Sequence, residues 1–228
     1  MRPCIFTAIV LACTARLAVA DVLVEVDQTA TDTWLAVSGD AGVSAVLADL
    51  ANVSASDSTD NKWTPRLDYL IDGYDSMHSR GAPDLPPEMS ITTSGLLDGQ
   101  DYDVFARYLV YTAGDNFATK FGLTSGSLTV FNRNTVGATV VASAPLYGGK
   151  AEIRESLLGT VTVIGSAITV YFDDDGAHEG QANAVRFAAR PVPEPGTPAL
   201  LMIGVGAAFI FARNRYRPRS GPHVYRSP

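Results

Sequence analysis

Residues 102–111 read Tyr-Asp-Val-Phe-Ala-Arg-Tyr-Leu-Val-Tyr, and this stretch decides the fold class of the 228-residue chain. Side chains alternate across a β-strand, so one face of the stretch is mostly apolar and the other is mixed. The first face carries Tyr102, Val104, Ala106 and Tyr108, and the second carries Asp103, Phe105, Arg107 and Leu109. The pattern predicts a strand with one side in a core.

Similar short, β-branched stretches occur on both sides of it, separated by Gly-rich turns such as 95–99. Residues 39–53 predict either a strand pair or a short helix, and 54–61 predict a loop. No amphipathic helix is evident, so the chain is predicted to be all-β and to fold as a β-sandwich. The other predicted strands are 22–27, 88–93, 117–123, 126–131, 137–143, 153–158, 160–164 (broken from the preceding one at Gly159), 167–172 and 184–189.

An irregular segment, 62–87, is rich in aromatic residues and provides the first candidate binding surface. Aromatic rings stack on sugars when exposed, whereas buried rings simply build a core. Trp34 and Tyr69 are further aromatic candidates. Trp63 and Tyr74 are the candidate carbohydrate-binding residues because they lie in this segment.

Four carboxylates lie close together in the sequence: Asp173, Asp174, Asp175 and Glu179. Adjacent carboxylates repel one another unless they are solvated or bridged by a cation, and Ca²⁺ prefers oxygen ligands. They are candidate ligands of a structural Ca²⁺, with a solvated turn as the alternative. No other cofactor is predicted.

Catalytic patterns are weak in this chain. His78 and His178 are the histidines between the two terminal segments, and a transition-metal site normally needs three or more nitrogen or sulfur ligands. No Gly-x-Ser-x-Gly turn and no phosphate-binding glycine pattern is present. We therefore predict no catalytic residues and no enzyme activity.

Charge is divided between the regions of the chain. Residues 21–190 hold 23 Asp and Glu against 10 Lys and Arg, a balance of −13, whereas the residues after Ala212 hold five arginines and no acid. Phosphate contacts need Lys and Arg, so an acidic domain excludes nucleic acid as a partner.

The N-terminus, 1–20, is predicted to be a signal peptide. Arg2 precedes an apolar stretch, and Ala18-Val19-Ala20 has the small residues that signal peptidase reads, with cleavage before Asp21. A lipoprotein signal ending at Cys13 is the alternative. Both cysteines, Cys4 and Cys13, lie in this leader, so the mature domain is expected to have no disulfide.

The C-terminus has three consecutive parts. A proline-rich motif, Val192-Pro193-Glu194-Pro195-Gly196, follows the last predicted strand, and its prolines favour an extended linker. An uncharged run then predicts a transmembrane helix at about 198–212, close to the roughly 17-residue lower limit for a span. Arginines favour a cytoplasmic end after it, and 218–228 is predicted to be a disordered cytoplasmic tail. The basic stop, 213–219, consists of Arg213, Arg215, Arg217 and Arg219.

This order of motif, apolar run and arginines over residues 191–217 resembles the PEP-CTERM sorting signal of bacterial envelope proteins. The resemblance implies export, anchoring in the cell membrane and processing near Pro-Glu-Pro by a membrane-embedded exosortase, followed by a place at the cell surface or outside the cell.

Residues 88–188 resemble, in outline, a galactose-binding-like jelly-roll domain of exported planctomycete-type proteins, a resemblance that implies a fold and no activity. The matching residues are 94–96, 102–105, 122–128, 158–160 and 169–174.

The sequence thus predicts three parts: a signal peptide at 1–20, a β-sandwich domain at 21–190 and a sorting signal at 191–217. The predicted function is that of an exported, surface-sorted, non-catalytic protein of the envelope or extracellular matrix. A carbohydrate-binding module for exopolysaccharide and a hydrolase are the alternatives.

Overall fold

A computed structural model describes residues 19–30, 33–54, 61–79, 86–113, 117–146, 148–176 and 178–191. Contacts divide the chain into two units, residues 1–190 and 191–228, each described by itself. Several predictions fall outside the described residues: the two cysteines, Ala18, the motif at 192–196, the helix at 198–212, the arginines at 213–219 and the tail at 218–228. Within the described ranges, no helix has the length and apolar character needed to cross a membrane.

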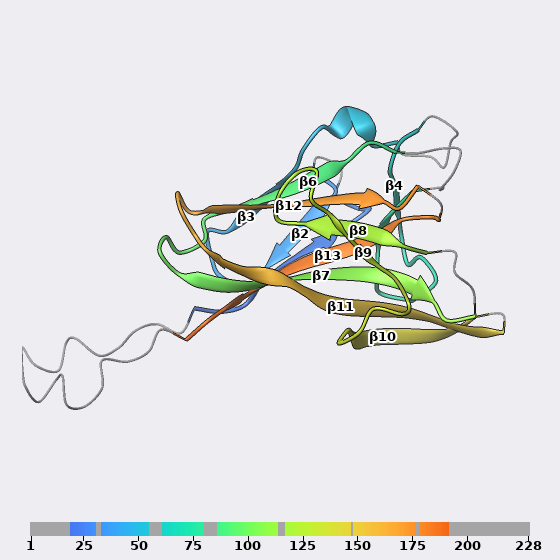
Figure 1. Cartoon of the computed structure of the whole chain (residues 1–228). Coiled ribbons are helices and arrows are strands. Elements are labelled where there is room, and N and C mark those ends of the chain that lie inside the picture. The colour runs from blue at the N-terminus through green and yellow to red at the C-terminus, as the bar shows by residue number, and fades with distance from the viewer. Residues whose placement is uncertain are drawn as a thin grey trace, which may run out of the picture. The chain divides into compact units, whose positions relative to one another are not determined.

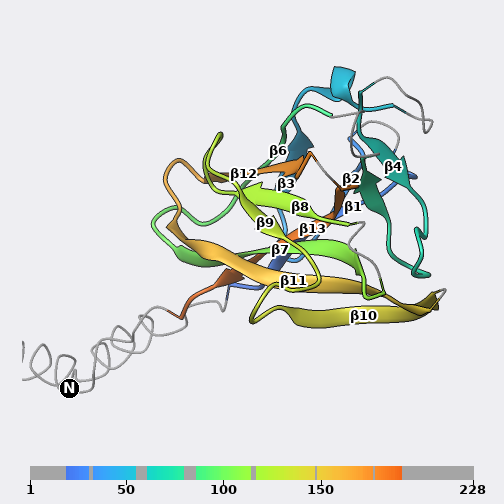
Figure 2. The ribbon, with the colours of Figure 1, turned by 45° about the vertical axis from the view of Figure 1, so that its right-hand side comes forward.

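The described part of the first unit is a sandwich of two antiparallel sheets (Figures 1 and 2). Sheet A has the order β10-β11-β7-β13-β1-β2, with β5 also pairing with β13 and β4 pairing with β5. Sheet B has the order β3-β6-β12-β8-β9. The elements are β1 (Val22–Val26), β2 (Leu35–Ser38), β3 (Ser44–Leu47), the 3-10 helix η2 (Leu50–Asn52), β4 (Thr64–Arg66), β5 (Ser76–His78), β6 (Met89–Ser94), β7 (Asp101–Tyr111), β8 (Thr119–Gly122), β9 (Thr129–Phe131), β10 (Thr139–Leu146), β11 (Gly149–Thr162), β12 (Ala167–Asp174) and β13 (Gln181–Ala189).

The predicted all-β sandwich is confirmed, and the finer assignment to the galactose-binding-like jelly rolls stays a prediction. The break predicted at Gly159 is wrong: β11 runs through it, and a β-bulge between Leu157 and Gly159 keeps the strand paired with β7. The segment 62–87 contains two short strands, β4 and β5, and β2 was not predicted. Residues 39–53 form one strand and a 3-10 turn.

The main core lies between the sheets, and β7 builds much of it with the inward face that its alternation predicts. Tyr102, Val104, Ala106 and Tyr108 are all buried there. The Tyr108 hydroxyl is also buried, and it lies 2.9 Å from the Ser156 hydroxyl, which satisfies its hydrogen-bonding capacity.

A second, smaller cluster covers the outer face of sheet A. It contains Leu109 of β7 and Ile153 of β11, and Ile71 from the loop between β4 and β5 packs against them. The second half of β7 is therefore buried on both faces, which explains why Tyr108, Leu109 and Val110 are all inaccessible to water.

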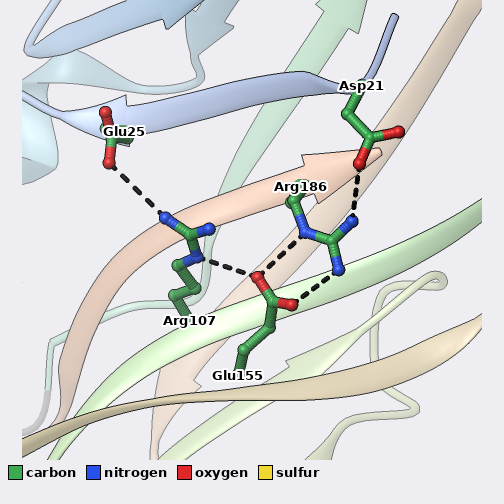
Figure 3. A network of polar contacts seen from close by, with 5 residues as sticks. All are labelled: Asp21, Glu25, Arg107, Glu155 and Arg186. Atoms are coloured by element: carbon green, nitrogen blue, oxygen red, sulfur yellow. Dashed lines mark hydrogen bonds and ion pairs between the residues drawn. The ribbon is translucent and has the colours of Figure 1, made fainter. Parts of the chain in front are cut away.

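A network of charges crosses the first half of this outer face (Figure 3). Glu155 of β11 accepts hydrogen bonds from Arg107 of β7 at 2.8 Å and from Arg186 of β13 at 2.6 and 3.0 Å. Arg186 also bonds Asp21 at 2.9 Å, and Arg107 lies 3.6 Å from Glu25 of β1. The network thus links four neighbouring strands of sheet A.

Glu155 is the centre of the network because its carboxylate lies between two guanidinium groups. Burial by itself would raise its pKa, but the hydrogen bonds and charges of Arg186 and Arg107 outweigh burial and hold the pKa below its usual value. The resulting stabilisation is present at neutral pH and is lost as the pH falls through the lowered pKa of the folded state.

We expect Glu155→Gln to lower the free energy of unfolding at pH 7 by about 2 kcal/mol, because it leaves two partly buried guanidinium groups without their shared anion. The matched control is Glu25→Gln at the rim, where the carboxylate is 38% exposed against 11% for Glu155, and the loss should stay below about 0.5 kcal/mol. Urea unfolding at pH 7 measures both. Equal losses in the two variants would contradict a central role for Glu155.

The turn between β6 and β7 contains Gly95, which has a φ of +86° and lies against the backbone of Gly42. We expect Gly95→Ala to lose clearly more stability than Gly126→Ala, because Gly126 has a similar φ of +72° but open space around it. The control variant should lose about 1 kcal/mol from its left-handed conformation alone. Thermal unfolding of both variants tests this, and similar melting temperatures would contradict it.

Candidate functional site

The sequence singled out the end of β12, where three aspartates follow one another. The two aspartates of the strand point to opposite sides, since side chains alternate: Asp173 faces Lys120, 3.5 Å away, and Asp174 faces the interior. Burial raises the pKa of Asp173, and Lys120 partly offsets this.

The other two predicted ligands of Ca²⁺ pair with histidines in separate places. Asp175 lies 2.7 Å from Nδ1 of His178, and Glu179 lies 3.3 Å from Nε2 of His78. Among the residues described, no group of three or more His, Cys, Asp or Glu side chains is arranged to hold a metal ion. Ca²⁺ binding at the four carboxylates therefore stays a prediction, and the geometry adds no support to it.

Asp174 is the most unusual of these groups because it is a carboxylate that is only 2% exposed. Its Oδ1 accepts a hydrogen bond from the Gly176 amide at 3.0 Å, and the Ser79 hydroxyl lies close enough to the carboxyl to lower its pKa, whereas Oδ2 is buried without a well-formed hydrogen bond in the described part of the chain. Burial, with added repulsion from Asp173, raises its pKa to about 6. The sequence carried a signal for this burial, because Ile168, Val170 and Phe172 precede Asp174 on the inward face of the strand.

His78 is buried, and both of its ring nitrogens are engaged. Nε2 faces Glu179, and Nδ1 lies 3.5 Å from an Arg66 guanidinium nitrogen. The ring of Tyr69 lies 5.3 Å away, between centroids. The imidazole is thus held by a cation, an anion and an aromatic ring, which is an arrangement that fixes a side chain.

The structure places Trp63 in the core, and its predicted role in stacking on a sugar is wrong. The side chain is fully buried, its indole N–H donates to the Pro87 carbonyl at 2.9 Å, and its ring meets Phe172 edge-on at 5.1 Å. A ring with both faces covered offers no stacking surface. Tyr74 is half-buried against the outer cluster of sheet A, so carbohydrate binding there stays a prediction.

The cavities of the described part of the domain include two shallow ones. One, of about 240 Å³, is lined by Phe117, Ala118, Asn132, Arg133, Asn134 and His178. The other, of about 230 Å³, includes Tyr74, Asn183 and four carboxylates: Glu25, Asp27, Asp68 and Asp75. Both are smaller than the roughly 300 to 1,000 Å³ typical of small-molecule sites.

The two ends of the domain lie on neighbouring strands, since β1 pairs with β13. The predicted cleavage site precedes Asp21, which stands directly before β1 and bonds Arg186 of β13. At the other end the Arg190 amide donates to the Asp101 carbonyl at 2.9 Å. The Gln100 side chain donates to the Arg190 carbonyl at 2.6 Å, so the hydrogen bonding of the fold closes at Arg190.

A β-sandwich is followed in the sequence by a proline-rich motif, an apolar run and arginines, which is the order expected of an exported protein with a C-terminal sorting segment. Residues 191–215 match the family model of the PEP-CTERM protein-sorting motif. None of the curated proteins matches the chain. The chain therefore carries a PEP-CTERM motif, and such a motif marks an exported protein that an exosortase processes and that is sorted to the cell surface.

We expect the contribution of Asp174 to the free energy of unfolding to fall as the pH rises from about 4 to about 6. The folded state holds a proton on this carboxyl up to a pH of about 6, whereas the unfolded chain releases it near 3.8, so the stabilisation by the proton is full below about pH 4 and is lost as the pH rises through about 6. Ionisation of Asp174 costs about 3 kcal/mol at neutral pH by this difference.

Asp174→Asn removes the titration and keeps an oxygen for Gly176, so its stability should change less over this pH range than that of the wild type. Stability should also rise by about 1 to 2 kcal/mol at pH 7. Thermal unfolding at closely spaced pH values measures the difference, with the exposed Asp72→Asn as a control. A variant profile parallel to the wild-type profile would contradict the titration of Asp174.

Proposed function

We propose that the chain is exported, held in the cell membrane by the segment after residue 197 and processed near Pro193-Glu194-Pro195, and that the released domain works without catalysis at the cell surface or in the extracellular matrix. One observation carries the proposal: the matched motif begins at residue 191, immediately after the residue at which the fold closes.

The position of the motif supports processing without damage to the fold. Every strand of the described domain ends by Ala189, so a cut near 193–195 leaves each strand pair of the sandwich intact. The domain also suits the outside of the cell, because the net charge of −13 over residues 21–190 favours solubility and these residues contain no cysteine, so the core does not depend on a disulfide.

The contacts of the acid and imidazole groups support a non-catalytic role. His78 is buried and pairs with Glu179, so its imidazole does not face the solvent or a cavity. A general acid or base must instead face the proton of a substrate in a cleft. The hydrolase and the carbohydrate-binding module stay predictions, and the burial of Trp63 leaves the second of them with Tyr74 alone.

We expect the mature protein from a host with an active exosortase to begin at Asp21 and to lack residues 199–228. In the triple variant Pro193→Ala/Glu194→Ala/Pro195→Ala, the C-terminal segment should remain and the protein should stay in the membrane fraction. Mass spectrometry of the medium and envelope fractions measures both outcomes.

The matched control is Pro222→Ala, which changes a proline beyond the matched residues and should be processed normally. The same wild-type chain in a host without exosortase should behave like the triple variant. Mature wild-type protein that retains residues 199–228 beside an active exosortase would overturn the proposal.

A further inference from the structure

Two large apolar side chains are exposed on neighbouring turns at one end of the sandwich. Leu97, on the turn from β6 to β7, is 55% exposed, and Ile164, on the turn from β11 to β12, is 85% exposed. Single exposed aliphatic residues are ordinary on protein surfaces. Two of them on turns that are joined to each other form a combined apolar tip.

The two turns are joined by four hydrogen bonds. The amides of Gly95 and Leu96 both donate to the Ser166 carbonyl, at 2.9 and 3.1 Å, and the Gly99 amide donates to the Val163 carbonyl at 2.9 Å. The Gly165 amide donates to the Asp98 carboxylate at 2.8 Å. We call residues 95–99 and 163–166 together the turn pair.

The turn pair is fastened to the core beneath it. Leu96 and Val163, each one position before an exposed residue, are buried in the main core. Leu97 and Ile164 are therefore held outward by a rigid base, and they can meet an apolar surface without reorganisation of the domain. Pre-organisation of this kind lowers the entropic cost of binding.

This tip lies at the end of the sandwich where the domain stops. Gln100 connects the two: its carbonyl accepts from the Val163 amide at 2.9 Å, and its side chain bonds the Arg190 carbonyl. Figure 1 shows the turns from β6 to β7 and from β11 to β12 at the same end as the last residues of β13.

The chain length after Arg190 limits how far this end can be from a membrane. Eight residues, 191–198, separate Arg190 from the apolar run that begins at Ala199. Even a fully extended chain spans at most about 3.6 Å per residue, so these residues reach about 30 Å. That length is about the thickness of the hydrocarbon core of a bilayer and less than that of the whole membrane.

We propose that the turn pair docks on the lipid surface, with Leu97 and Ile164 entering the headgroup region while the uncut chain is anchored. The inference rests on the proposed function, because it needs the membrane-held precursor. Two aliphatic side chains bind lipid weakly in solution, but a short tether makes the contact intramolecular and raises its effective concentration. A cut after Arg190 removes the tether, so processing and release of the domain become a single event.

The charges around the tip select the kind of lipid. Asp98, Asp101 and Asp103 lie on or beside the turn pair, and Arg190 pairs with Asp103 at 3.1 Å. Three acids against one arginine disfavour an anionic surface, so the proposed partner is a membrane of zwitterionic lipid.

The absence of cysteines from the mature sequence allows a clean test. The full exported chain, with residues 191–228 intact, is purified from a host without exosortase and reconstituted into phosphatidylcholine vesicles. Leu97→Cys and Val136→Cys each carry an environment-sensitive fluorophore. Val136 is 97% exposed and precedes β10, whose first residue, Thr139, pairs with Glu155 in the middle of β11, away from the turn pair. Spin-labelled headgroups quench a fluorophore that enters the interface.

We expect the fluorophore at position 97 to be quenched at least twofold more than the one at position 136. Adding Ile164→Ser to the Leu97→Cys protein should reduce the quenching by about half, whereas adding Val136→Ser should not. Because the fluorophore is itself apolar, this dependence on Ile164 is the decisive readout. Vesicles rich in phosphatidylglycerol should weaken the quenching.

The outcomes that contradict the proposal distinguish failure of the membrane anchor from failure of the docking. A chain that fails to sediment with the vesicles overturns both the anchor and the docking. A chain that sediments, but whose positions 97 and 136 are quenched equally, overturns the docking alone. Loss of exosortase processing in Ile164→Ser, with no quenching at position 97, would identify a protein partner for the tip and also overturn the lipid proposal.

Discussion

Strand β7 must be covered on both faces, and the rest of the sandwich follows from that requirement. It lies between β11 and β13 in sheet A, and its inward side chains form the main core. A strand in the middle of a sheet can leave its outer face to water, yet three consecutive residues of β7, at 108–110, are inaccessible. The two halves of the outer face meet the requirement differently.

The first half is covered by charges and the second by apolar side chains. Around Glu155, guanidinium groups lie over the sheet, and Arg186 also stacks on Phe105 with 4.1 Å between the guanidinium carbon and the ring centroid. Farther along, the loop between β4 and β5 lays Ile71 over Leu109. The aromatic segment 62–79 is thus largely used to complete the fold. This explains why Trp63 is buried, although the sequence predicted it to be a binding residue.

Local alternation in the sequence predicts most strands of this domain and the inward face of β7. The same alternation indicates that Asp174 is buried, because Asp174 continues the inward-facing series of β12. The features that local alternation does not predict depend on partners far away in the chain. The short strand β5 pairs with β13, and β4 pairs in turn with β5. The bulge at Gly159 keeps β11 in register because β7 lies beside it. The carboxylates of 173–179 show the same limit, because neighbours in sequence take separate partners in space.

The closure of the fold at Arg190 has a consequence for the evolution of such proteins. The Gln100 side chain and the Asp101 carbonyl satisfy the backbone groups of Arg190, so the hydrogen bonding at the end of β13 is complete at the junction with the sorting motif. A gene fusion or recombination event at this junction would exchange the sorting signal without disturbing the β-sandwich domain. Different domains could acquire the same destination in one step, and this domain could move to another anchor or to none while retaining its architecture.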